Sequence, residues 1–156
     1  MKSIIIGIDP GQTGAIASLE NGKIVDLRDM PTMGRAHGKG HEVDPYELTS
    51  ILLAMKFGKD ATVLVEQVSA MPGNGGTSMF HFGESVGVIL GVCGALQLPV
   101  RRIRPQHWKK KAGIIGKDKD AARGLAIRLH PEVSDMLTRK KDCGRADAVC
   151  IAEFGA

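Results

Sequence analysis

Residues 3–11 read SIIIGIDPG, an isoleucine-rich run that ends in an aspartate followed by Pro-Gly. A short continuous apolar run is typical of a strand buried on both faces, and Pro-Gly marks the turn that ends it. This stretch therefore predicts a central strand over residues 3–9. It places Asp9 at the end of that strand.

The segments that follow extend this strand into a sheet. Residues 15–20 and 23–30 flank Asn21-Gly22, a pair suited to the positive φ angles of a type I′ turn, so a hairpin is expected. Residues 44–47, Asp-Pro-Tyr-Glu, offer an N-cap, a proline at the first helical position and an acid at N3. A crossover helix that leads into the β-branched run 61–66 favours a strand parallel to the first.

The remaining segments complete an α/β pattern. Residues 31–43 predict a mobile loop that folds over substrate, and the glycine-rich segment 69–78 predicts an irregular loop facing DNA. Residues 85–100 lack charge, are too few to span a bilayer and predict a buried helix. A strand is expected at 100–104, and helices are expected near 105–112, 118–129 and 145–154. This order indicates a mixed five-stranded sheet flanked by helices, in a single domain over residues 1–156.

Composition and charge narrow the class of protein. The N-terminus lacks the apolar core and cleavage site of a signal peptide, so a cytoplasmic protein with no membrane partner is expected. Cys93, Cys143 and Cys150 lack metal-ligand spacing and indicate neither a disulfide framework nor a zinc site. Residues 101–128 hold ten lysines and arginines against two aspartates. This imbalance favours phosphate binding over a set of merely solvated helix faces.

Three acids fall where the predicted fold could bring them together. Asp9 and Glu66 end neighbouring parallel strands, and Asp147 lies in the first turns of the last helix. Taken singly, Asp9 could cap its own turn and Asp147 could mark a solvent-facing side of the helix. Together, three carboxylates repel one another unless cations bind, and hard oxygen ligands suit Mg²⁺ or Mn²⁺. Two such ions would activate a water and stabilise the leaving 3′ oxygen of a phosphodiester, without a protein nucleophile.

Several motifs resemble those of a known family. In order, residues 6–11 (IGIDPG), 65–68 (VEQV) and 146–148 (ADA) resemble RuvC-type Holliday junction resolvases of the ribonuclease H-like superfamily, especially the small phage versions. Further similar stretches at 82–91, 105–109 and 116–119 extend the resemblance over nearly the whole chain. The resemblance implies a ribonuclease H-like fold and a homodimer that binds branched DNA at a four-way junction. It also implies symmetric nicking with Mg²⁺, for which Mn²⁺ substitutes, ligatable ends and no nucleotide cofactor.

The resemblance also implies roles for individual acids. Asp9, Glu66 and Asp147 correspond to catalytic metal ligands. The fourth acid of the family stands three residues before the last aspartate, where this chain has Gly144. Asp142 is the nearest substitute and is taken as the fourth catalytic ligand.

Candidate DNA contacts lie on two other segments. Lys117 and Lys119 are the first choices for phosphate binding, followed by Lys109 and Lys110. Bacterial members of the family carry an aromatic wedge shortly after the glutamate, where this chain has no aromatic residue. Met71 or Phe80 could instead unstack a base step, although core packing is the preferred role for Phe80.

Gly83, Gly87 and Gly91 recur every four residues. They indicate either a dimer interface or tight packing of a helix on its own sheet, and the sequence does not favour one of these readings.

Three alternative functions stay open. Residues 9–14 also match the phosphate loop of actin-like and sugar-kinase domains, but such a domain needs a second similar loop and a second large domain. The missing acid at Gly144 is compatible with a junction-binding module that has weak or no cleavage activity. A nuclease with a broader range of branched DNA or RNA–DNA hybrids is the third alternative.

Overall fold

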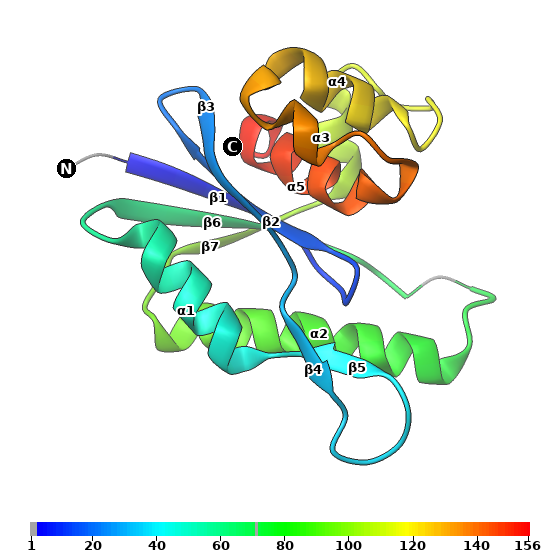
Figure 1. Ribbon diagram of the computed structural model, residues 1–156. Helices are drawn as coiled ribbons and strands as arrows, with labels where there is room; N and C mark the ends of the chain where they lie inside the picture. Colours follow the sequence, from blue (N-terminus) through cyan, green and yellow to red (C-terminus); the bar gives the residue numbers. More distant parts are fainter. Residues whose placement is uncertain (1–2, 71) are drawn as a thin grey trace.

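A five-stranded sheet forms the centre of the computed structural model, which describes residues 3–70 and 72–156 (Figure 1). The strand order is β3-β2-β1-β6-β7. The first three strands are antiparallel neighbours, and the last two are added parallel to β1. Their bounds are β1 (Ser3–Asp9), β2 (Ala15–Glu20), β3 (Lys23–Asp29), β6 (Asp60–Glu66) and β7 (Val100–Ile103). The predicted mixed five-stranded sheet is confirmed.

Local signals in the sequence explain the first elements. Asn21 and Gly22 join β2 to β3 with φ angles of 52° and 74°, as a type I′ turn requires. Helix α1 (Pro45–Lys56) begins after Asp44, whose carboxylate accepts hydrogen bonds from the backbone N–H groups of Tyr46 and Glu47 at 2.9 and 3.1 Å. Both the predicted hairpin and the predicted helix start are confirmed.

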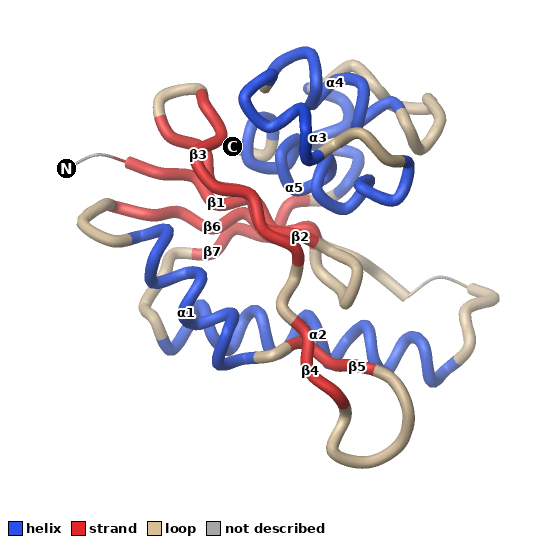
Figure 2. The backbone as a smooth tube through the Cα atoms, viewed as in Figure 1, coloured by secondary structure: helices blue, strands red, loops and turns tan. Residues whose placement is uncertain are grey.

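Helices cover both faces of the sheet (Figures 1 and 2). On one face lie α1 and the long helix α2 (Gly76–Ala95), and on the other lie α3, α4 and α5. Each face of the sheet has its own apolar core. Isoleucines of β1 point into the core under α1 and α2. The remaining elements are α3 (Pro105–Lys111), α4 (Ala121–Leu129), α5 (Cys143–Phe154) and the short 3₁₀ helices η1 (Pro131–Met136) and η2 (Lys140–Asp142).

The predicted mobile loop at residues 31–43 is wrong in part. It contains a second, two-stranded sheet, formed by β4 (Thr32–Gly34) and β5 (His41–Val43). Arg35 fixes this hairpin to the body, because its guanidinium pairs with Glu42 at 3.3 Å and with Glu84 of α2 at 2.9 Å. The glycine-rich loop also ends earlier than predicted, since α2 already begins at Gly76.

Helix α2 is less buried than predicted. Only Ser85, Ile89 and Cys93 are buried among its described residues, so one side faces the core and much of the rest is exposed. A Cβ atom added at Gly83, Gly87 or Gly91 would meet no atom within 4 Å, which excludes tight packing of these glycines on their own sheet. By length and composition alone, α2 could also cross a membrane, but core helices of ordinary domains pass the same test.

Candidate active site

Two strand ends and one helix bring three acids to the same edge of the sheet. Asp9 ends β1 and Glu66 ends β6, and the parallel register pairs the residues just before them, Ile8 with Val65. Helix α5 lies directly against β1, because a Cβ atom at Gly7 would overlap the backbone of this helix at Ala148 and Ala152. Gly7 therefore lets α5 come close enough to carry Asp147 to the strand ends.

The three carboxylates are electrostatically coupled. Burial, followed by the charges of Asp147 and Glu66, raises the pKa of Asp9 to about 8, while the charge of Lys109 opposes the shift. Burial, followed by the charge of Glu66, raises the pKa of Asp147 to about 6. Burial also raises the pKa of Glu66, against a hydrogen bond from Trp108 and the charge of Lys109. Each of the three acids is therefore costly to ionise in the absence of a cation.

The donor set fits a hard divalent cation. All three groups are carboxylates, the ligands that Mg²⁺ and Mn²⁺ prefer, and a cation would relieve both burial and mutual repulsion. Within residues 3–70 and 72–156, no three His, Cys, Asp or Glu side chains already stand together in metal-binding geometry. To share one cation, the three carboxylates would therefore have to come closer together.

Trp108 holds Glu66 in place, a contact that the sequence did not predict. Its indole Nε1–H donates a hydrogen bond of 2.8 Å to Glu66 Oε1, and the ring is fully buried. The next residue, Lys109, places its ammonium 5.3 Å from the centroid of the same ring and acts on all three carboxylates. Neighbouring positions on α3 thus supply a buried hydrogen-bond donor and a cation to the site.

Asp142 is not brought to the other acids. Its side chain accepts hydrogen bonds from the Arg139 guanidinium, the shortest 2.7 Å, and from the Arg139 backbone N–H at 2.8 Å. Arg145 lies 3.7 Å away and also pairs with Asp29. Hydrogen bonds from Arg139 are the main reason that the pKa of Asp142 falls to about 2. The arginines already compensate this charge, so the prediction of Asp142 as the fourth ligand is not supported by its contacts.

The geometry around Gly144 explains why no acid stands there. A Cβ atom at this position would lie 3.4 Å from Asp9 Oδ2, so the position is indeed beside the site. The same atom would overlap the carbonyl oxygen of Thr13. Backbone of the β1–β2 loop therefore fills the space that a fourth acidic side chain would need.

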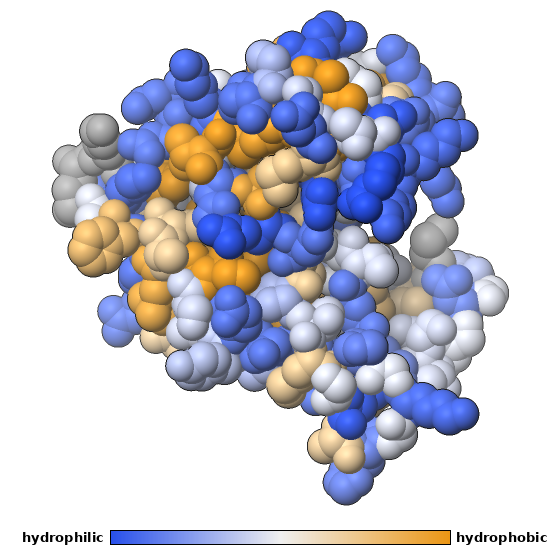
Figure 3. Space-filling model, viewed as in Figure 1, coloured by the Kyte–Doolittle hydropathy of each residue, from blue (hydrophilic) through white to orange (hydrophobic). Residues whose placement is uncertain are grey.

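A cationic pocket adjoins the acids. It has a volume of about 310 Å³, and its lining includes Lys109, Lys117 and Lys119 together with Asp147. Lys110 is exposed and does not line this pocket. Figure 3 shows a hollow at this edge of the molecule, between the layer of α3 to α5 and the first turns of α2, with hydrophilic side chains along its upper rim.

The structure describes one of the two candidate wedge residues and leaves out the other. Met71 lies outside the described residues. Phe80 is 69% exposed on α2, so its predicted packing in the core is wrong. Its ring lies in an edge-to-face arrangement with that of His81, with the two centroids 5.9 Å apart.

Comparisons with known proteins agree with this geometry. No family model matches the sequence. A chloroplastic Holliday junction resolvase, MOC1 of Chlamydomonas reinhardtii, is 38% identical over 91 residues, which is 58% of this chain and 10% of the relative. The chain thus spans about a tenth of the length of the curated relative that it matches.

Two solved structures share the fold. Thermus thermophilus RuvC in complex with a Holliday junction substrate matches with a TM-score of 0.61 and 14% identity, over 96% of this chain and 90% of that chain. A second Thermus thermophilus RuvC structure matches with a TM-score of 0.57 and 18% identity over the same shares of the two chains. The chain therefore has the ribonuclease H-like fold of RuvC, and its sequence is similar over 91 residues to a Holliday junction resolvase.

Proposed function

We propose that this chain is a metal-dependent endonuclease that resolves four-way DNA junctions by hydrolysing phosphodiester bonds. The observation that carries the proposal is the set of coupled carboxylates, Asp9, Glu66 and Asp147, beside a pocket lined by lysines. Acids that favour a divalent cation next to cations that favour phosphate suit phosphoryl chemistry. Similarity to a protein named a Holliday junction resolvase supports the choice of substrate.

The residues of the site fall into metal ligands, a residue that positions one ligand, and residues that bind phosphate. Asp9, Glu66 and Asp147 would hold Mg²⁺, or Mn²⁺ in its place. A cation held there would supply activation of the attacking water and stabilisation of the leaving 3′ oxygen. Trp108 occupies one lone pair of Glu66 Oε1 and fixes the orientation of this carboxylate. Lys109 and the lysines of its pocket bind and orient the phosphate groups on either side of the bond that is cleaved.

Three acids are sufficient in this proposal. Asp142 serves as an anchor for the start of α5 through Arg139 and Arg145, rather than as a ligand. Gly144 leaves the Thr13 carbonyl in place beside Asp9. The alternative of a catalytically weak binding module is therefore not required by the missing acid.

The protein acts as a homodimer in this proposal, with α2 at the interface. The exposed glycines Gly83, Gly87 and Gly91 would let a second backbone approach closely, and a two-fold protein suits symmetric nicking of a junction. Sedimentation of Gly87→Arg checks this point, because a bulky charge on this stripe should yield a monomer. A dimer that persists would place the interface elsewhere. The single domain and the cytoplasmic location stay predictions.

Cleavage of a labelled four-way junction tests the function. Duplex, flap and RNA–DNA hybrid serve as controls, and each is assayed with Mg²⁺, with Mn²⁺ and with EDTA. Paired symmetric nicks in the junction alone, absent with EDTA and in Asp9→Asn, are the expected result. Equal cleavage of flaps or hybrids would favour the broader nuclease. Junction binding without cleavage in either metal would favour the binding module.

A further inference from the structure

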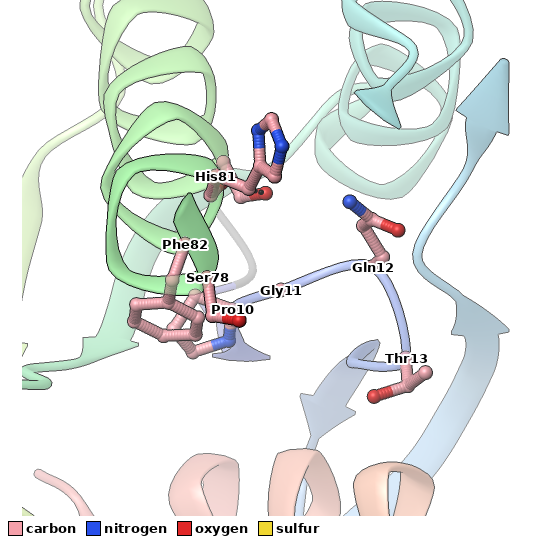
Figure 4. A pocket seen from close by; sticks show the side chains of 8 residues that line it. Pro10, Gly11, Gln12, Thr13, Ser78, His81 and Phe82 are labelled. Atoms are coloured by element: carbon pink, nitrogen blue, oxygen red, sulfur yellow. Dashed lines mark hydrogen bonds between the residues drawn. The ribbon is translucent and has the colours of Figure 1, made fainter. Parts of the chain in front are cut away.

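A second pocket opens beside the acids, on the side away from the lysines. Its volume is about 310 Å³, and two segments line it. The β1–β2 loop contributes residues 10–13, which directly follow Asp9, and the first half of α2 contributes Ser78, His81, Phe82 and Ser85. Figure 4 shows His81 and Gln12 on opposite sides of this pocket, one on the helix and one on the loop.

The lining of this pocket is polar and contains no carboxylate, lysine or arginine side chain. Gln12 offers a carboxamide, Thr13 and Ser78 offer hydroxyls, and His81 offers an imidazole. Nδ1 of His81 is buried and has no hydrogen-bond partner in the described part of the chain. Phe82 adds an aromatic ring, which a Cβ atom at Gly11 would approach to 3.2 Å. The pocket therefore combines donors, acceptors and an apolar wall.

The two pockets differ in the chemistry that they would accept. The pocket next to Asp147 carries three lysines and suits the charged phosphates of a DNA strand. The pocket next to Asp9 carries none and suits an uncharged planar group with hydrogen-bonding edges. A strand whose phosphate lies at the acids has its backbone charges and its bases within reach of these two different surfaces.

We propose that the pocket formed by residues 10–13 and the first half of α2 receives one unstacked nucleobase next to the scissile phosphate. This inference rests on the proposed function and adds a source of sequence preference to it. Taking a base out of its stack opposes entry least where the base is mismatched or already single-stranded. Gln12 and His81 read the hydrogen-bonding edge of the base, and Phe82 contacts its apolar surface.

The test measures base preference at each position that flanks the cleavage site. Mobile junctions that present all four bases, and an abasic residue, at these positions are cleaved with Mg²⁺ by the wild type, Gln12→Ala, His81→Ala and the double variant. Lys117→Ala is the matched phosphate control. Gln97→Ala removes an exposed glutamine at the opposite edge of the sheet, before β7. Junction affinity is measured in parallel with Ca²⁺ in place of Mg²⁺.

The expected result is a preference of about tenfold or more at one flanking position in the wild type, since one good base contact contributes ~1–3 kcal/mol of discrimination. The double variant should cleave all bases and the abasic junction at similar rates. Lys117→Ala should slow every junction equally, and Gln97→Ala should behave as the wild type.

Two outcomes would overturn the nucleobase site while leaving the endonuclease intact. One is junction cleavage by the wild type without any flanking preference. The other is a preference that survives in the Gln12→Ala, His81→Ala double variant. Absence of junction cleavage in the wild type would instead remove the proposed function, and the nucleobase site with it.

Discussion

Two aspartates at the start of α5, five residues apart, have opposite surroundings. Asp142 is held by Arg139 and Arg145, which keep its pKa near 2. Asp147 faces Glu66 and Asp9 instead, and its pKa is raised to about 6. A carboxylate whose charge is already compensated stabilises the fold, whereas one that is buried among other acids lacks a cation. On the same short segment, Asp142 is therefore an anchor for α5, and Asp147 is the proposed metal ligand.

Replacing each of the two aspartates with asparagine should show the largest difference between them. Asp147→Asn should reduce junction cleavage by at least about 100-fold, because metal stabilisation of the transition state is worth several kcal/mol and each ~1.4 kcal/mol is tenfold in rate. Asp142→Asn should change cleavage by less than about tenfold in folded protein, since it removes no metal ligand. Single-turnover rates at saturating enzyme measure both. A matching loss in Asp142→Asn, with normal folding and binding, would return Asp142 to the metal site.

Trp108 offers a finer test of the ligand group. Trp108→Phe removes the hydrogen bond to Glu66 but keeps an aromatic ring in the core. Loss of such a supporting contact should weaken metal affinity by about 10–100-fold. Mn²⁺ binding followed by electron paramagnetic resonance measures this without relying on activity. Wild-type Mn²⁺ affinity in a folded Trp108→Phe protein would limit Trp108 to a packing role.

The pH dependence of stability should have opposite signs for the two kinds of acid. The pKa of Asp9 is raised to about 8 from an ordinary 3.8, so its ionisation destabilises the metal-free fold increasingly from pH 4 to pH 8. Asp9→Asn in EDTA should therefore melt several degrees above the wild type at pH 8, and the difference should shrink towards pH 4. Thermal melts across this range would show the reverse trend if Asp9 were a stabilising, ion-paired acid.

Asp142 should behave in the contrary way. Its folded pKa is lowered to about 2, so its contribution is present above pH 4 and is lost as the pH falls towards 2. Asp142→Asn should melt a few degrees below the wild type at pH 7 and approach it near pH 2. Calorimetry at both pH values provides the comparison, with Asp135→Asn as an exposed control on η1. A constant difference at all pH values would mean that ionisation of Asp142 is unimportant.

The smallest expected effect concerns the lysines. Lys117→Ala should lower the slope of log affinity against log salt by about one, the value for one lost phosphate contact, whereas Lys110→Ala should change it little. Junction titrations at several salt concentrations measure both slopes. Equal slopes for the two variants would mean that Lys117, which lines the pocket beside Asp147, contacts phosphate no more than Lys110 does.

Sequence reasoning located the acids that regular structure positions, but it could not anticipate which side chains those acids contact. Asp9 and Glu66 follow from two apolar runs, because parallel strands must end at one edge. Asp142 is the acid nearest in sequence to Gly144, but the 3₁₀ turn η2 brings it to Arg139, and these contacts do not support a role as metal ligand. Nothing local identifies Trp108 as a hydrogen-bond donor to Glu66, which lies 42 residues earlier.

The hairpin at residues 32–43 was missed for a related reason. Among the residues of its two short strands only Val43 is buried, so the segment lacks the apolar alternation by which strands are recognised. Arg35 instead ties the segment together through ion pairs, one of which reaches α2. Such a contact cannot be inferred from composition.

The close contact between Gly7 and α5 also bears on when the protein becomes active. The first strand supplies Asp9, while the last described helix supplies Asp147, and only their packing across Gly7 brings the two together. A chain still emerging from the ribosome has the first acid long before the last one. The coupled carboxylates can therefore come together only after the chain has been synthesised beyond Asp147.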